Sequence, residues 1–272
     1  MHPDLIDFGV FHLKTYGAMM ALGFIAAWQM CAWLCKRDGR NVEALSNLLI
    51  LMMAGGIVGA RIAYVIEHWQ TEFAGNLAEI VRIDKGGLMF YGGLIADAIL
   101  FCGWCAAKKE NPLDMGDLVC TVLPLGHAFG RVGCFFYGCC YGKVSANACA
   151  VRFPRLSPAW YEHYNQGLVG YNAGESLPVL PTQLFEAAAM LVLFAVLLAV
   201  YLKVRKRFAK GFVAGTYLVL YAAWRCVNEV LRGDPRATVG GILTIGQTIS
   251  LAMAAIGLAL VARAAVKRRS PK

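Results

Sequence analysis

The stretch QLFEAAAMLVLFAVLLAVYLK, residues 183–203, decides the class of fold. A helix that crosses the roughly 30 Å hydrocarbon core of a bilayer needs about 20 consecutive, mostly apolar residues. This stretch has that length, and Glu186 is its only acidic residue. We therefore predict that it forms a membrane-spanning helix.

The rest of the chain has the same apolar character. Hydrophobic residues make up 58% of the 272 residues, charged residues only 16%, and the mean hydropathy is +0.55, whereas soluble domains are about 45–50% apolar. Six further runs are long enough to span a bilayer, at residues 15–35, 46–67, 88–107, 114–131, 212–231 and 241–263. The sequence predicts an all-α integral membrane protein, a single membrane domain over residues 1–272 with seven transmembrane helices.

Basic residues indicate the orientation of these helices. They gather in alternate connections and in the C-terminal tail, and the positive-inside rule assigns such segments to the cytoplasm. Examples are Lys36, Arg37, Lys108, Lys109, Lys203, Arg205, Arg263 and Lys267. We expect the N-terminus outside and the C-terminus in the cytoplasm. A basic rim facing anionic lipid explains the net charge of +9, so no nucleic-acid partner is expected.

One long polar connection, about residues 132–182, separates the fourth and fifth runs. It contains Trp160, Tyr161, Tyr164 and Tyr171, and it is too long for a simple turn. We predict a small extracytoplasmic cap here. The alternative for most of these aromatic side chains is an interfacial position at the level of the lipid headgroups.

The fourth run ends in a glycine-rich motif, GHAFGRVGCFFYGCCYG, residues 126–142. An arginine at bilayer depth costs roughly 2.5–3.5 kcal/mol on insertion scales, so Arg131 is expected to face a cavity or an anionic ligand. Gly130, Gly133 and Gly142 remove side chains around it, which would let a substrate approach the guanidinium group. These residues are predicted to form part of a binding site.

A second charged group lies at the end of the sixth run. Arg225, Glu229 and Arg232 follow one another at i, i+4 and i+7, which places them on one face of a helix. Their net positive charge and the guanidinium forks suit bidentate contacts with a phosphate. The alternative is a structural ion-pair network that locks helices together.

These segments together resemble the prolipoprotein diacylglyceryl transferase family. Its members are bacterial membrane enzymes that move a diacylglyceryl group from phosphatidylglycerol to the cysteine thiol of a lipoprotein precursor. The similar segments are the arginine motif at 130–142, Tyr16-Gly17, the glycine block at 86–93, the stretch 181–186 with Gln183 and Glu186, the arginine pair at 225 and 232, and Gly246-Gln247.

The resemblance implies the activity and the site. It implies transfer from phosphatidylglycerol to a lipoprotein precursor, release of glycerol phosphate, a bacterial inner-membrane location, and no cofactor or metal. Catalytic roles are expected for His127, Arg131, Arg225 and Glu229. Substrate-binding roles are expected for Tyr16, Tyr91, Gly130, Gly133, Gly142, Gln183 and Arg232.

The chain departs from the family pattern in two places. Cys134, Tyr137 and Cys139 replace two asparagines and a glutamate, and Tyr91 stands where the family usually has histidine. A different acceptor is therefore one alternative. A non-catalytic or redox membrane protein that uses its outer cysteines is another.

A proton acceptor is needed because the thiolate is the effective nucleophile and an ordinary cysteine pKa of about 8.5 leaves few thiolates at pH 7. His127 is the first candidate, because it lies four residues before Arg131 and so on the same helical face. Glu229 and Glu186 are the competing carboxylates.

The chain has ten cysteines, and Cys134, Cys139 and Cys140 form an outer cluster with Cys149 nearby in sequence. In an oxidising compartment a pair among these four could form a disulfide that rigidifies the cap. Zinc is the less favoured alternative, because Cys139 and Cys140 are adjacent and no histidine stands at a ligand spacing.

Overall fold

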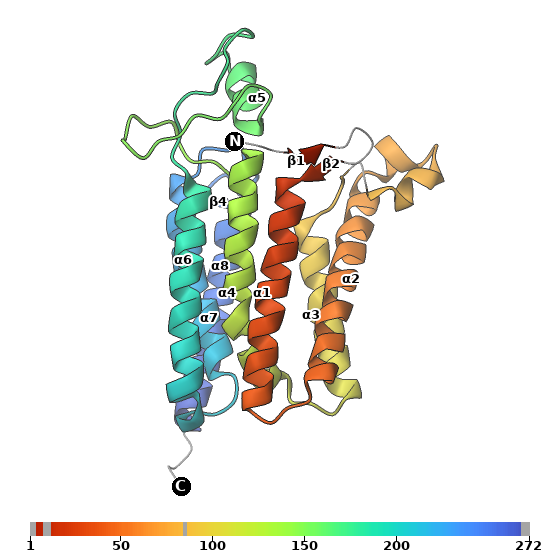
Figure 1. Ribbon diagram of the computed structural model, residues 1–272, viewed down its shortest axis with the longest axis vertical. Coiled ribbons are helices and arrows are strands. Elements are labelled where there is room, and N and C mark those ends of the chain that lie inside the picture. Colours follow the sequence, from red (N-terminus) through yellow and green to blue (C-terminus); the bar gives the residue numbers. More distant parts are fainter. Residues whose placement is uncertain (1–3, 8–11, 84–85, 268–272) are drawn as a thin grey trace. The chain divides into compact units, whose positions relative to one another are not determined.

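The computed structural model describes residues 4–7, 12–83 and 86–267 (Figure 1). These residues form two compact units. Of the described residues, unit 1 contains 4–7, 12–31 and 116–267, and unit 2 contains 32–83 and 86–115. Two helices, α1 (Thr15–Arg37) and α4 (Pro112–Tyr137), begin in one unit and end in the other.

Unit 1 is built around α4, α6 (Thr182–Ala199), α7 (Phe212–Leu231) and α8 (Ile245–Val266), which run side by side in Figure 1. Gly215 of α7 and Gly257 of α8 face each other, since a Cβ atom on either would lie 2.8 Å from the carbonyl oxygen of the other. Small residues of this kind let membrane helices approach closely. They bring α8 against α7 along its length.

Asp117 of α4 fixes the start of α7. Its side chain is fully buried, and its two carboxylate oxygens accept hydrogen bonds from the backbone N–H groups of Gly211 and Ala214, each at 2.9 Å. A carboxylate at a helix N-terminus satisfies free N–H groups and complements the helix dipole. These two hydrogen bonds join α4 to the start of α7.

The end of α6 is followed by short irregular helices, η4 (Val200–Val204) and η5 (Arg205–Arg207). A short antiparallel hairpin, whose strands β3 (Thr238–Val239) and β4 (Leu243–Thr244) have two residues each, leads from α7 into α8. Near the N-terminus, β1 (Asp4–Asp7) pairs antiparallel with β2 (His12–Lys14).

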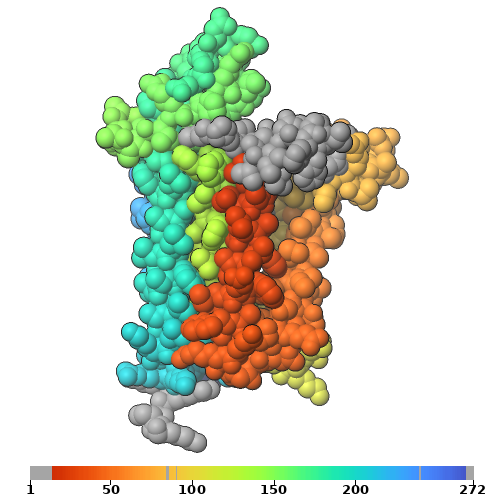
Figure 2. All heavy atoms as spheres, in the orientation of Figure 1, coloured from red at the N-terminus to blue at the C-terminus, as the bar shows by residue number. Residues whose placement is uncertain are grey.

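Residues 138–181, here called the α4–α6 connection, fold into a small structure of their own. Phe153, Ala159 and Val179 form its core together with Tyr141, and α5 (Pro158–Asn165) contributes Ala159 to this core. Figures 1 and 2 show the connection beyond the start of α6. Trp160 is also buried, at 1% exposed, and its Nε1 donates to the Ala173 carbonyl oxygen at 2.8 Å.

The other aromatic residues of the connection lie at its surface. Tyr161, Tyr164 and Tyr171 are 48%, 40% and 61% exposed. Tyr164 stacks on Trp160 with 5.3 Å between the ring centroids, and the Arg155 guanidinium lies over Tyr171. The connection therefore combines a buried core with an exposed aromatic face.

Unit 2 contains α2 (Val42–Glu67) and α3 (Phe90–Ala107), with η1 (Trp69–Phe73) and η2 (Leu77–Val81) between them. Gly59 and Gly92 lie at the contact of the two long helices, since a Cβ atom on either would meet the carbonyl oxygen of the other within 2.7 Å. Arg61 donates to four backbone carbonyl oxygens, of Glu79, Ile80, Gly86 and Gly87. It holds the segment between the helices in place.

Five of the described helices are long and apolar enough to cross a membrane: α1, α2, α4, the α6 segment and α8. The chain is thus an all-helical protein with several membrane spans. The predicted runs 88–107 and 212–231 are helices as well, α3 and α7. The apolar part of α3, Tyr91–Ala107, is shorter than the five spans. The polar residues near the end of α7 lower the mean hydropathy of that helix.

Candidate active site

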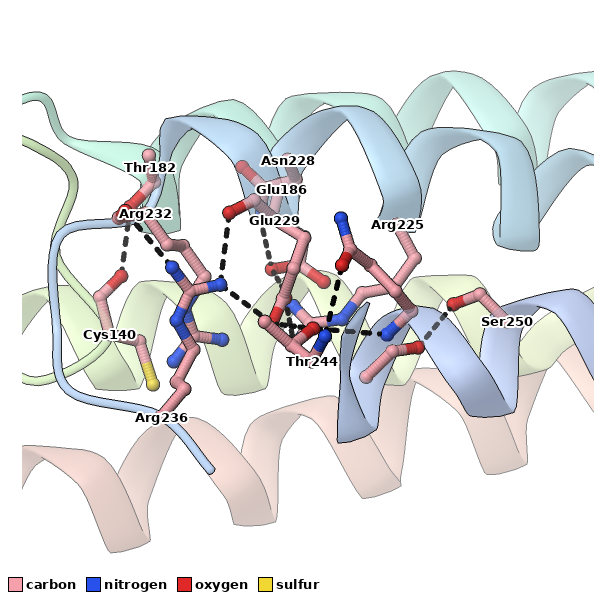
Figure 3. A network of polar contacts seen from close by, with 12 residues as sticks. Cys140, Thr182, Glu186, Arg225, Asn228, Glu229, Arg232, Arg236, Thr244 and Ser250 are labelled. Atoms are coloured by element: carbon pink, nitrogen blue, oxygen red, sulfur yellow. Dashed lines mark hydrogen bonds and ion pairs between the residues drawn. The ribbon is translucent and has the colours of Figure 1, made fainter. Parts of the chain in front are cut away.

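Glu186 lies at the centre of a polar site in unit 1 (Figure 3). Its side chain is 1% exposed and projects from the second turn of α6. Its Oε2 atom lies 3.1 Å from Nε of Arg131 and 3.7 Å from Nη1 of Arg225, and it accepts a hydrogen bond from Nδ2 of Asn228 at 2.8 Å. One carboxylate therefore joins α4, α6 and α7.

His127 and Arg131 are paired one turn apart on α4. Nε of Arg131 donates to Nε2 of His127 at 3.0 Å. A guanidinium N–H can only donate, so Nε2 of His127 carries no proton and the imidazole is neutral. The same Nε2 atom lies 3.5 Å from Oε1 of Glu186.

Glu229 of α7 is the second carboxylate of the site. It is 3% exposed and pairs with Nη2 of Arg225 at 2.8 Å and with Nη1 of Arg236 at 2.6 Å. Thr244 donates to its Oε1 at 2.8 Å, and Thr244 is also the N-cap residue of α8, where it forms a capping box with Gln247. The start of α8 is thereby tied to the charged face of α7.

Arg232, at the end of α7, makes two hydrogen bonds to Asp234, at 2.9 and 2.5 Å. Arg236 donates to the carbonyl oxygens of Glu229 and Arg232, at 2.9 and 3.1 Å. In the predicted stripe, Glu229 and Arg232 are thus buried, and the Arg225 side chain is 14% exposed. Arg225 pairs with Glu186 and Glu229, whereas Arg232 pairs with Asp234.

The arginine–carboxylate network, as we call this site, has an excess of positive charge. In the described residues it contains four guanidinium groups and three carboxylates, and His127 is neutral. Its members are Arg131, Arg225, Arg232, Arg236, Glu186, Glu229 and Asp234. Nη1 of Arg225 is buried and has no hydrogen-bond partner among the described residues. A buried donor of this kind suits an anionic ligand.

The glycines of the motif at 126–142 make close packing possible. A Cβ atom on Gly133 would lie 3.1 Å from the Tyr16 ring, and one on Gly130 would lie 3.2 Å from the Met20 sulfur. Gly142 is still more confined, because its Cβ would lie 2.7 Å from Leu180. The structure therefore gives Gly130 and Gly133 a packing contact with α1, and it gives Gly142 one with Leu180, just before α6.

The remaining predicted residues lie in different places. Gln183 is fully buried and donates to the Cys139 carbonyl oxygen at 2.7 Å. Tyr16 lies in the first turn of α1 with 41% of its surface exposed, and Tyr137 ends α4 with 45% exposed. Tyr91 lies in unit 2, near the start of α3.

The ten cysteines, all of them in the described residues, are free thiols. The sulfur atoms of Cys134, Cys139 and Cys140 lie within 4.8 Å of one another. Cys149 is exposed and does not belong to this group. The sequence-based expectation of a disulfide among the four remains a prediction.

Two members of the network, Arg236 and Asp234, are absent from the site predicted from the sequence, and so are Asn228 and Thr244, which donate to its carboxylates. Glu186 was expected only as a competing base. Asn228 has a local signal, since it stands between Arg225 and Glu229 in a membrane helix, where polar side chains are costly. Arg236 and Thr244 lie in a loop and a helix cap, where polar residues are ordinary, so the sequence gives no signal for them.

Comparison with known proteins identifies the family of the chain. The model of the family described as prolipoprotein diacylglyceryl transferase matches residues 3–263. A phosphatidylglycerol–prolipoprotein diacylglyceryl transferase of Clostridium tetani is 33% identical over 260 residues, which covers 95% of this chain and 96% of the relative. A protein of the same name from Xanthomonas oryzae pv. oryzae is 32% identical over 279 residues, covering 99% and 92%.

Proposed function

The chain belongs to the prolipoprotein diacylglyceryl transferase family, and on this basis we propose that it transfers a diacylglyceryl group from phosphatidylglycerol to a cysteine thiol of a lipoprotein precursor. The names of the relatives state this donor and this acceptor. The chain spans more than nine-tenths of the length of both relatives.

The buried Nη1 atom of Arg225, which makes no hydrogen bond among the described residues, supports this function. It lies in a network with one more positive than negative charge. The lipid phosphate would bind between Arg131 and Arg225, and would replace part of their contact with Glu186. Guanidinium groups suit this role because they make bidentate contacts with phosphate oxygens.

The reaction would proceed as a displacement at carbon. The acceptor sulfur, as a thiolate, forms a bond with the glyceryl carbon that carries the phosphoester. The bond between that carbon and the phosphate oxygen breaks, and glycerol phosphate leaves with the electron pair. Arg131 and Arg225 would stabilise the charge on the departing phosphate, which is the type of electrostatic stabilisation that contributes most in many enzymes.

His127 would accept the thiol proton. In the structure its Nε2 lone pair receives the Nε–H of Arg131. When a phosphate draws Arg131 away, this lone pair becomes free to act as a base. Donor binding would thereby activate the base in the same step. Glu186, 3.5 Å from the same nitrogen, would stabilise the imidazolium that forms.

We also propose the membrane arrangement that the basic residues indicate. All seven predicted runs would cross the inner membrane, with the N-terminus and the α4–α6 connection outside and the C-terminus inside. Arg131 and Glu186 lie near the ends of α4 and α6 that join this connection, so the site would open to the outer leaflet. A periplasmic reporter inserted at Gly170 should be active, and the same reporter after Lys267 should be inactive; the reverse would refute this orientation.

The activity is tested with the purified protein in phosphatidylglycerol vesicles and a peptide that carries a lipobox cysteine. Mass spectrometry should show a peptide heavier by one diacylglyceryl group. The same peptide with serine in place of cysteine, and vesicles of phosphatidylcholine, are the controls that should give no product. An unmodified cysteine peptide under conditions in which an active relative modifies it would contradict the proposal.

A further inference from the structure

The cysteine cluster, Cys134, Cys139 and Cys140, is not used by the proposed reaction. Its three sulfur atoms lie within 4.8 Å of one another. Metal–sulfur bonds of about 2.3 Å to a shared ion place sulfur atoms about 3.8–4.0 Å apart. Small side-chain rotations would therefore bring all three sulfur atoms to bonding distance from one ion.

A tight turn at the end of α4 creates this convergence. Cys134 lies in the last turn of the helix, and its carbonyl oxygen accepts the N–H groups of Gly138 and Cys139 at 2.9 and 3.3 Å. Gly138 has φ of 85° and Cys140 has φ of 58°. A left-handed conformation is unusual for cysteine and costs about 1–2 kcal/mol. It turns the chain back so that Cys140 lies beside Cys134.

Two buried side chains of α6 hold this turn in place. Gln183 donates to the carbonyl oxygen of Cys139 at 2.7 Å, and Thr182 donates to that of Cys140 at 2.8 Å (Figure 3 shows the second bond). Both side chains are fully buried. The backbone of the two adjacent cysteines is thus fixed from outside the cluster, which is the kind of support that orients metal ligands.

The surroundings of the cluster suit negatively charged ligands. Arg131 lies three residues before Cys134 on α4, and the backbone of Arg232 pairs with that of Gly142, two residues after Cys140. A zinc ion with three thiolates carries one net negative charge, and a monovalent copper ion with three thiolates carries two. The one excess positive charge of the arginine–carboxylate network would offset the charge of the zinc form fully and that of the copper form in part.

We propose that Cys134, Cys139 and Cys140 form a three-thiolate site for a thiophilic metal ion, zinc or monovalent copper. Thiolates select such ions over magnesium, calcium or manganese. A disulfide is the less suitable product of this geometry, because it uses two of the three sulfur atoms and leaves the third unpaired. In an extended chain, adjacent cysteines point in opposite directions and are an uncommon pair of zinc ligands. The turn at Cys140 brings the two side chains to the same side.

The test is metal binding by the full-length protein in detergent, purified with a reductant and freed of metal. Zinc and monovalent copper are added separately, and bound metal is measured by mass spectrometry against a competing chelator. Cobalt serves as a third probe, since thiolate ligands give it strong charge-transfer absorption. We expect about one ion of zinc or of copper per chain, and the two titrations identify which ion binds more tightly.

Serine variants locate the ligands. Loss of a residue that only hydrogen-bonds to a metal ligand weakens metal affinity about 10- to 100-fold. Loss of a ligand itself should have a larger effect, so C134S, C139S and C140S should each weaken binding at least 100-fold. C149S is the matched control, because Cys149 is exposed and lies outside the cluster; it should bind like the unmodified protein. Monodisperse elution of each variant verifies that it is folded.

X-ray absorption of the metal-loaded unmodified protein needs no variant and should show three sulfur neighbours at about 2.3 Å. Four results would each overturn the proposal. These are no stoichiometric binding of either metal by protein with reduced thiols, undiminished binding in all three serine variants, fewer than three sulfur neighbours, and a disulfide within the cluster in protein isolated without reductant.

Discussion

The Nε–H group of Arg131 points to Nε2 of His127 at 3.0 Å, and the same Nε atom lies 3.1 Å from Oε2 of Glu186. One donor is thus shared by a neutral imidazole and a buried carboxylate. Because Arg131 occupies the lone pair of His127, the position of this arginine determines whether the histidine can accept a proton. This arrangement links phosphate binding to base catalysis in the proposed reaction.

Replacement of His127 by glutamine should reduce kcat about 100-fold, because glutamine can accept the Arg131 hydrogen bond but cannot take a proton at neutral pH. The KM for phosphatidylglycerol should change little, because the arginines that bind the phosphate remain. Steady-state kinetics in mixed micelles measures both constants. H163Q makes the same replacement in the α4–α6 connection and should retain activity. A kcat above half that of the unmodified protein in H127Q would exclude His127 as the base.

Replacement of Arg225 by lysine should reduce kcat/KM for phosphatidylglycerol about 100-fold. Lysine keeps the charge but loses the planar fork, and the removal of one stabilising donor typically costs two to three orders of magnitude. R263K is the control, because Arg263 is exposed and contacts the Lys210 carbonyl oxygen near the other end of α8. Equal kinetics for R225K and R263K would show that the fork at position 225 is not used.

The helices could be predicted from the sequence, but their ends and partners could not. Each apolar run corresponds to a helix. About 20 apolar residues that cross a bilayer must pair their own backbone N–H and C=O groups, and an α-helix does this within one segment. α2 begins at Val42, earlier than predicted, because Asn41 caps it by accepting from the Ala44 N–H. α8 begins at Ile245, later than predicted, because β3 and β4 precede it and Thr244 is its cap.

The site could be predicted only in part for a similar reason. Helical spacing predicts that Arg225 lies beside Glu229, and the two are in fact 2.8 Å apart. The central position of Glu186 depends on how α6 packs against α4 and α7, which spacing within one helix cannot reveal. The approach of Cys140 to Cys134 depends on a left-handed residue that the sequence does not signal. Contacts between elements are therefore what the structure adds.

Replacement of Gly142 by alanine should destabilise the junction between the α4–α6 connection and α6. The new Cβ would lie 2.7 Å from both Cβ and the carbonyl oxygen of Leu180. Overpacking of this kind costs about 1–3 kcal/mol, so the midpoint of thermal unfolding should fall. G170A is the control, because a Cβ at Gly170 would meet nothing within 4 Å. Equal unfolding midpoints for the two variants would contradict the packing role of Gly142.

His163 should make the stability of the α4–α6 connection depend on pH. Burial lowers the pKa of His163, and its Nδ1 accepts the Leu177 N–H at 3.2 Å. The unfolded chain, with a histidine pKa of about 6.5, then binds the proton more readily than the folded chain. The stabilisation is therefore complete above about pH 7 and is lost as the pH falls below about 6.5.

Hydrogen exchange of the connection, measured between pH 5 and pH 8 and corrected for the intrinsic rate, checks this dependence. Protection around Leu177 should decrease at the acidic end in the unmodified protein. H163Q keeps an acceptor for the Leu177 N–H but has no proton to bind in this range, so its corrected protection should be constant. The same acid-induced loss in both proteins would assign the effect to another group.

The fate of the two halves of the lipid distinguishes diacylglyceryl transfer from other reactions of phosphatidylglycerol. Phosphatidylglycerol carrying one isotope in the diacylglyceryl part and another in the headgroup glycerol is incubated with the protein and a lipobox peptide. We predict that the first isotope appears in the peptide and the second in free glycerol phosphate, in equal amounts, and that R131A forms neither product. Headgroup isotope in the peptide, or labelled peptide formed without glycerol phosphate, would contradict the proposed transfer.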